Sequence, residues 1–204
     1  MSHVIWPAAL ALCRWLGNHP ERCLGAHVLE LGAGSGAPGL VALTLGAASL
    51  TLTDGDEDLL ELMQTNCELN VREVPTRAAL CAVRELDWRQ AAHVGVARAA
   101  RPEGCSLVLA TDVTFGAGDF EPLVRAAAAL LERAPRARLL LARSTWFEGL
   151  QHTLLAVAEA AGLQLLQETE GADEGAAVLE LGWSRAALAQ ETICKHGRES
   201  TCLD

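Results

Sequence analysis

The sequence contains no tyrosine, no C-x-x-C pair, no long apolar run and no dense cluster of Lys or Arg. A membrane-spanning helix needs about 20 consecutive apolar residues, so we expect no membrane association. Finger-type zinc sites use two ligand pairs, and the scattered Cys194, His196 and Cys202 provide no second pair, so we expect no metal site. The net charge of −10 disfavours nucleic acid as the main partner and suits a basic protein or peptide better.

The seven cysteines are scattered along the chain. Most fall in expected helices or strands, where cysteine acts as a small apolar side chain. We therefore expect a reducing compartment, the cytoplasm, with the nucleus left open as a second location. At 204 residues, half of them hydrophobic, the chain is long enough to bury the core of one domain. We expect this domain at residues 1–183, a polar and loosely ordered tail at 184–204, and a monomer.

The most informative segment is VLELGAGSGAPG, residues 28–39. It places Glu30 near the end of an apolar strand, and Gly32, Gly34 and further glycines then open into a helix. Such glycines remove Cβ atoms where a ligand approaches backbone N–H groups at a helix N-terminus, and the helix dipole favours an anion there. Asp54 closes the next apolar strand, where a nucleotide-binding βαβ unit places the acid that holds ribose hydroxyls. The segment therefore predicts a cofactor site.

The glycine pattern alone leaves the cofactor open. Gly32, Gly34 and Ala37 also satisfy the G-x-G-x-x-G/A fingerprint of nicotinamide and flavin dinucleotide sites. A plain strand-to-helix turn that tolerates glycines is a further alternative, which the nearby acids Glu30 and Asp54 make less attractive. Segments elsewhere in the chain distinguish between these interpretations.

Hydrophobic periodicity predicts an α/β fold in which strands and helices alternate. The expected strands are 26–31, 48–53, 76–84, 105–111, 138–141, 163–169 and 176–182. The expected helices are 7–16, 38–45, 56–69, 120–133 and 147–161, and residues 88–101 are ambiguous, with helix as one option. The last two strands flank a turn and form an antiparallel hairpin, which is not how a dinucleotide-dependent dehydrogenase ends.

Five segments together resemble the class I S-adenosylmethionine-dependent methyltransferases, and most closely the seven-β-strand protein-lysine methyltransferases called methyltransferase family 16. The segments are VIWPAALAL, VLELGAGSG, TLTDGDEDLLELMQTN, VRELDW and LVLATDVTF. They occur in the family's order and spacing, and the resemblance extends from Trp6 to about Trp183. It implies a Rossmann-like, mostly parallel seven-stranded sheet with helices on both faces and a C-terminal antiparallel hairpin. It also implies S-adenosylmethionine as the cofactor.

Five of the expected cofactor-binding residues come from the glycine loop and the two acids. The backbone amides around Gly32, Ala33 and Gly34 are expected to receive the carboxylate of the cofactor's methionine part. Glu30 is expected to balance the amino group, directly or through water, and Asp54 to accept the ribose hydroxyls.

Further site residues are expected on other strands. By resemblance, Trp6 lines the cofactor pocket from the first helix and Trp88 lies against the adenine. Thr111 falls at the carboxyl end of the fourth strand, where α/β sheets bind ligands. Asp112 and Phe115 occupy the place of the family's D-x-x-Y motif, beside the transferred methyl group. The resemblance assigns Asp112 to orienting an incoming lysine ammonium, with general base as the weaker option.

The family's tyrosine is Phe115 in this chain, and a phenyl ring can wall the pocket but cannot hydrogen-bond the acceptor nitrogen. Thr114 or Asp119 could supply the missing polar group, or the acceptor could be a residue other than lysine. The sequence therefore predicts an enzyme, an S-adenosylmethionine-dependent protein lysine N-methyltransferase. The alternatives are a non-catalytic partner-binding protein that retains the fold and a dinucleotide-dependent oxidoreductase.

Overall fold

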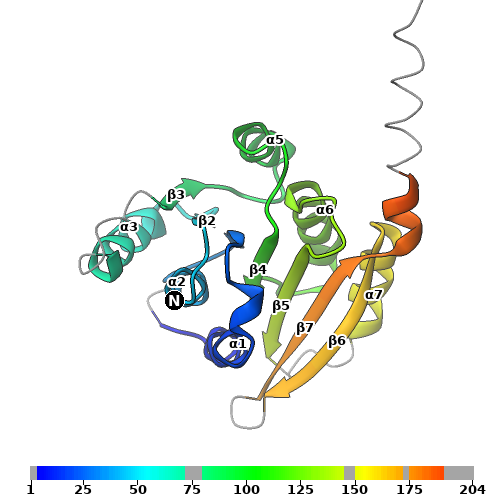
Figure 1. Ribbon diagram of the computed structural model, residues 1–204, viewed down its shortest axis with the longest axis horizontal. Helices are drawn as coiled ribbons and strands as arrows, with labels where there is room; N and C mark the ends of the chain where they lie inside the picture. The colour runs from blue at the N-terminus through cyan, green and yellow to red at the C-terminus, as the bar shows by residue number, and fades with distance from the viewer. Residues whose placement is uncertain (1–3, 72–79, 145–149, 172–174, 191–204) are drawn as a thin grey trace, which may run out of the picture.

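The computed structural model describes residues 4–71, 80–144, 150–171 and 175–190. These residues form one mixed sheet with helices on both faces (Figure 1). The strands are β1 His27–Leu31, β2 Ser49–Asp54, β3 Cys81–Glu85, β4 Leu107–Thr111, β5 Arg138–Ser144, β6 Leu163–Gly171 and β7 Ala176–Trp183. The helices are α1 Pro7–Asn18, α2 Ala37–Thr44, α3 Asp58–Val71, α5 Ala91–Ala100, α6 Phe120–Leu130 and α7 Gln151–Ala160, with 3₁₀ turns η1 Pro20–Arg22 and η2 Ala117–Asp119.

The seven strands lie in the order β3-β2-β1-β4-β5-β7-β6. The first five are parallel, while β7 pairs antiparallel with both β5 and β6. The order of the strands reverses at β1 and β4, because the chain adds β2 and β3 on one side of β1 and then places β4 and β5 on its other side. Such a reversal creates the crevice where open α/β sheets bind ligands. The Rossmann-like fold with a C-terminal antiparallel hairpin is therefore confirmed.

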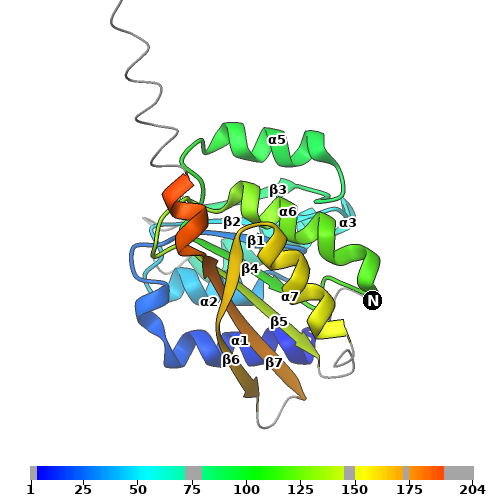
Figure 2. The same ribbon diagram turned by 90° about the vertical axis from the view of Figure 1, so that its right-hand side faces the viewer.

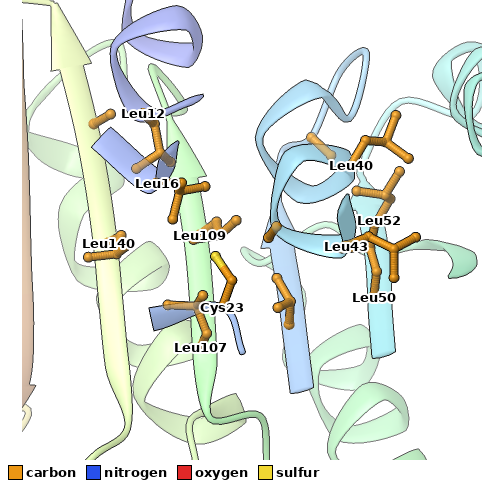
Figure 3. Close-up of a cluster of buried hydrophobic side chains, with 14 of the residues drawn as sticks. Leu12, Leu16, Cys23, Leu40, Leu43, Leu50, Leu52, Leu107, Leu109 and Leu140 are labelled. Carbon is orange, nitrogen blue, oxygen red and sulfur yellow. The ribbon is translucent and has the colours of Figure 1, made fainter. Parts of the chain in front are cut away.

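Helices cover both faces of the sheet, which explains why most side chains of the central strands are apolar. Figure 2 shows α5 and α6 on one side of the sheet and α1 and α2 on the other. The side chains of β4 alternate between the two layers: Leu107 and Leu109 belong to the core under α1 and α2, and Val108 and Ala110 to the core under α6 and α7. Figure 3 shows part of the first layer, in which leucines of α1 and α2 pack onto β1, β2, β4 and β5.

Two segments differ from the expected boundaries in ways that affect the site. β5 continues to Ser144, three residues beyond the expected end at Leu141, because Ala142, Arg143 and Ser144 pair with β7. The ambiguous residues 88–101 contain a helix, α5, at Ala91–Ala100. The expected strand and helix residues at 76–79 and 147–149 lie outside the described part of the chain.

The packed part of the chain extends beyond Trp183. Residues 185–190 are helical, and Ala187 is buried in the second core layer, where the methyl group lies against Gly162. The Ser184 carbonyl accepts a hydrogen bond from the Leu188 amide at 3.1 Å, as the first residue of a helix does. The domain therefore continues at least to residue 190, and the remaining tail, residues 191–204, lies outside the described residues.

Cys67 of α3 and Cys81 of β3 are joined by a disulfide, with their Cα atoms 6.5 Å apart. This pairing differs from the expectation that most of the cysteines act as small apolar side chains in a reducing compartment. It depends on a contact between two elements, and a separation of 14 residues gave no recognisable motif. Among the described residues, none of the helices combines the length and the apolar composition of a membrane span, and no three potential metal ligands lie together.

Candidate functional site

A cavity of about 310 Å³ opens at the carboxyl ends of the parallel strands, at the crevice between β1 and β4. Its walls come from the start of α1, the β1–α2 loop, and the segments that follow β2, β3 and β4. The sequence-predicted residues in the wall are Trp6, Gly32, Ala33, Gly34, Asp54, Trp88, Thr111, Asp112 and Phe115. The fold thus brings together every predicted site residue except Glu30.

The β1–α2 loop needs glycine at position 32. Gly32 has φ +61°, in the left-handed region, and a Cβ atom there would lie 2.5 Å from Cγ1 of Val113 and 3.3 Å from the Trp88 ring. The loop can therefore pack against the segment after β4 only without a side chain at this position. The result is a bare stretch of backbone in the cavity wall, as the glycine pattern predicted.

Asp54 has a second role that the sequence did not reveal. Its Oδ2 accepts a hydrogen bond from the Gly34 amide at 3.0 Å, and its Oδ1 accepts one from the Asp56 amide at 3.1 Å. A carboxylate offers about four acceptor positions, so two bonds leave capacity for a ligand. Asp54 therefore fixes the glycine loop and still presents an acceptor to the cavity.

Glu30 does not line the cavity, which argues against the expected direct contact with an amino group there, while a contact through water stays a prediction. Its side chain is fully buried beneath α2, where Oε2 accepts a hydrogen bond from the Gly39 amide at 2.8 Å. Burial raises the pKa of Glu30 to about 8, and Oε1 has no hydrogen-bond partner. A Cβ at Gly39 would lie 2.7 Å from Oε2, so that glycine permits the close approach. Glu30 anchors α2, because its side chain points from β1 toward the helix and not toward the cavity at the end of the strand.

Two tryptophans, Trp6 and Trp88, form part of the cavity wall. Trp6 lies at the start of α1 and remains 40% exposed. Trp88 follows β3, and its Nε1 donor is buried without a partner. The guanidinium of Arg89 lies 5.0 Å from the Trp88 ring centre and pairs with Asp119 at 2.9 Å. The loop after β3 is thereby linked to the loop after β4 at one side of the cavity.

Asp112 and Phe115, which follow β4, also line the cavity. Asp112 accepts hydrogen bonds from the Ser144 amide and the Ser144 hydroxyl, both at 2.7 Å. Phe115 is 71% exposed at the rim, so it can contact a large partner outside the cavity. Ser144 was not predicted as a site residue, because nothing in the sequence indicates that β5 reaches this edge.

Neither candidate replacement for the family's tyrosine hydroxyl lines the cavity at the carboxyl ends of the strands. Asp119 is held by the Phe115 amide at 2.9 Å and by Arg89, and the pKa of Asp119 is lowered first by that amide bond. Thr114 lines a narrow neighbouring cavity of about 20 Å³, which it shares with Asp112 and Arg143. Neither Thr114 nor Asp119 therefore replaces the family's tyrosine hydroxyl in this cavity.

The cavity wall fits a ligand with three distinct parts. The bare glycine backbone suits an anionic group, the Asp54 carboxylate suits hydroxyls, and the Trp88 ring suits a planar heterocycle that can also accept from the unpartnered Nε1. The buried Trp88 Nε1 has no hydrogen-bond partner, and the backbone at Gly32 has no room for a Cβ atom. These two features match the adenosyl and amino-acid parts of the cofactor expected from the sequence.

Comparison with known proteins independently supports a methyltransferase family for this chain. Residues 1–148 match the model of methyltransferase family 16, described as lysine methyltransferase. The protein N-terminal and lysine N-methyltransferase EFM7 of Eremothecium gossypii is 35% identical over 142 residues, 67% of this chain and 53% of that protein. The histone-arginine methyltransferase METTL23 of Homo sapiens is 31% identical over 137 residues, 66% of each chain. The chain spans about half the length of the EFM7 relatives that it matches.

The fold is shared with more distant solved structures. Magnesium protoporphyrin IX methyltransferase from Synechocystis, solved with S-adenosylmethionine bound, superposes with a TM-score of 0.63 at 15% identity, over 86% of this chain and 78% of that chain. The relatives named above are methyltransferases rather than dinucleotide-dependent oxidoreductases. With the family model covering residues 1–148, this chain belongs to the lysine methyltransferase family.

Proposed function

We propose that this protein transfers a methyl group from S-adenosylmethionine to a side chain of another protein, and that the acceptor is lysine. The observation that carries the proposal is the single cavity in which the glycine loop, Asp54, Trp88 and Asp112 meet. Membership of the lysine methyltransferase family and the similarity to EFM7 support a protein lysine as the acceptor. The net charge of −10 supports a basic partner.

The chain's own residues would hold the cofactor in three places. The backbone around Gly32 and Gly34 would receive the amino-acid carboxylate, because it is bare and begins a helix. Asp54 would accept the ribose hydroxyls with the capacity left by its two backbone bonds. Trp88 would contact the adenine, and Trp6 would cover the site from the start of α1.

S-adenosylmethionine supplies, when bound, a methyl group on a positively charged sulfur that is open to in-line attack. The protein's task is then to align the acceptor and to exclude water. A lysine with the ordinary pKa of about 10.4 needs about 4.6 kcal/mol to lose its proton at pH 7. A nearby carboxylate raises that pKa further, so Asp112 orients the ammonium and the proton leaves to solvent before the attack. Phe115 walls the acceptor position.

A direct test uses the protein with a cell lysate and a deuterated methyl donor, followed by mass spectrometry of the lysate proteins. We expect deuterated methyl groups on lysine of one or a few proteins, and no label with Asp112→Ala. If arginine or an N-terminus carried the label, that group would replace lysine as the proposed acceptor. Label found only on other groups, in both the wild-type and the Asp112→Ala samples, would contradict the proposal.

A second candidate function is favoured by Phe115, which lacks the hydroxyl of the family's motif. In that case the protein binds the cofactor and a partner but transfers nothing. Cofactor binding together with an unlabelled lysate would support this alternative over methyl transfer.

A further inference from the structure

Asp112 has an unusual backbone conformation. Its φ is +47°, and it is the one non-glycine residue in the described part of the chain with a positive φ. Side chains with a Cβ atom disfavour this region, so the conformation persists only where the surroundings fix it. The contacts that hold Asp112 in this conformation are therefore part of the site.

The restraint comes from β5. The Asp112 amide donates to the Ala142 carbonyl at 3.0 Å, and both carboxylate oxygens accept from Ser144. The Ser144 amide donates to Oδ1 and the Ser144 hydroxyl donates to Oδ2, each at 2.7 Å. One residue thus holds both oxygens and leaves the carboxylate no free rotation.

Ser144 is itself rigidly placed. It is 7% exposed, it is the last residue of β5, and it is paired with Ala176 of β7. A hydrogen bond to an ionised acceptor is stronger than one between neutral groups, so two such bonds from one buried residue form a firm clamp. Each carboxylate oxygen keeps a further acceptor position, and Asp112 lines the cavity.

We infer that Ser144 is a positioning residue for methyl transfer, because its amide and hydroxyl together fix the Asp112 carboxylate against the acceptor. The inference rests on the proposed function, in which Asp112 orients the acceptor nitrogen. Ser144 does not touch the acceptor in this account. It acts through Asp112, and a misplaced carboxylate lowers the rate of a step that depends on alignment.

A role limited to securing the end of β5 would give different results. In that case, removal of the hydroxyl would lower stability but leave the conformation of Asp112 and the turnover of the folded protein unchanged. The positioning role instead predicts a change at Asp112 in a protein that is still folded.

The first measurement uses the free protein and needs neither cofactor nor acceptor. Three-bond NMR couplings of Asp112 report whether its χ1 torsion occupies one rotamer or several. We expect one rotamer in the wild type and averaged couplings in Ser144→Ala. Ser106→Ala is the matched control, because its Oγ accepts from the His27 amide at the opposite edge of the sheet. Averaging in the control, or a single rotamer in Ser144→Ala, would overturn the inference.

The second measurement uses the acceptor protein found by the labelling experiment. We expect Ser144→Ala to lower kcat about tenfold, with KM for the acceptor and Kd for S-adenosylhomocysteine each within twofold of the wild type. Ser144→Thr retains the hydroxyl and should keep kcat within threefold. An unchanged kcat in Ser144→Ala would refute the inference. Absence of label with the wild type would instead refute the proposed function, and the NMR couplings would still decide the role of the clamp.

Discussion

Replacing Glu30 with glutamine should remove a pH-dependent penalty on the stability of this protein. The Glu30 side chain is fully buried, and burial raises its pKa from an ordinary value of 4.5 to about 8. In the unfolded chain the same group ionises near its ordinary pKa. Between the two values the native state therefore holds a proton that the unfolded state has released, and the free energy of unfolding falls as the pH rises.

The size of the effect follows from these two pKa values. Each pH unit between them changes the free energy of unfolding by about 1.4 kcal/mol, so the wild type loses on the order of 3 kcal/mol between pH 4.5 and pH 7. The loss ends above about pH 8, where Glu30 ionises in both states. The glutamine side chain in Glu30→Gln does not ionise and still offers an oxygen to the Gly39 amide, so the variant should not show this loss.

The assay is urea unfolding of the wild type and Glu30→Gln at several pH values from about 5 to 8. Subtracting the two curves cancels the groups that both proteins share. We expect the stability of Glu30→Gln relative to the wild type to rise by about 1.4 kcal/mol per pH unit. The exposed residue Glu61 on α3 gives the control, because Glu61→Gln retains Glu30 and should therefore lose stability with pH as the wild type does. A constant difference for Glu30→Gln would mean that the native carboxyl ionises normally, and the reasoning would be refuted.

Three further substitutions or treatments test other parts of the structure. Gly32→Ala adds a methyl group to a left-handed position without room for it and should destabilise the protein by about 1–3 kcal/mol in urea unfolding, whereas Gly17→Ala, with open space around it, should not; equal effects would contradict the account of the loop. Phe115→Tyr should leave folding unchanged at its exposed position and raise the rate of methyl transfer into the lysate acceptor; an equal or lower rate would place the ring away from the acceptor. Iodoacetamide should modify two fewer cysteines in the denatured, unreduced protein than after reduction, and equal numbers would show that Cys67 and Cys81 are not paired.

The sequence could place the glycine loop and Asp54 at one edge of the sheet because each signal there is local. Buried parallel strands are apolar throughout, and a strand followed by glycines and a helix leaves a recognisable pattern. Gly32 and Asp54 could be assigned from this pattern, since each lies at the end of a predicted strand. The fold brings both residues into one cavity with Trp88 and Asp112.

The contacts that the sequence could not predict all depend on distant segments. Whether Glu30 faces the strand end or α2 depends on the strand's orientation in the sheet, which the order of residues does not specify. Ser144 meets Asp112 because β7 pairs with the end of β5, although Arg143 interrupts the apolar pattern there. The pairing of Cys67 with a residue across the α3–β3 connection likewise depends on tertiary packing.

The most direct test of the central claim is calorimetric titration of the protein with S-adenosylhomocysteine, the product of the proposed reaction. We expect one molecule to bind per chain, and Asp54→Ala to weaken binding about tenfold or more, because the lost carboxylate accepts charge-assisted hydrogen bonds worth about 1.5–3 kcal/mol. Titration with NAD should release no heat. Absence of binding by the wild type, or equal affinity in Asp54→Ala, would contradict the assignment of this cavity as the cofactor site.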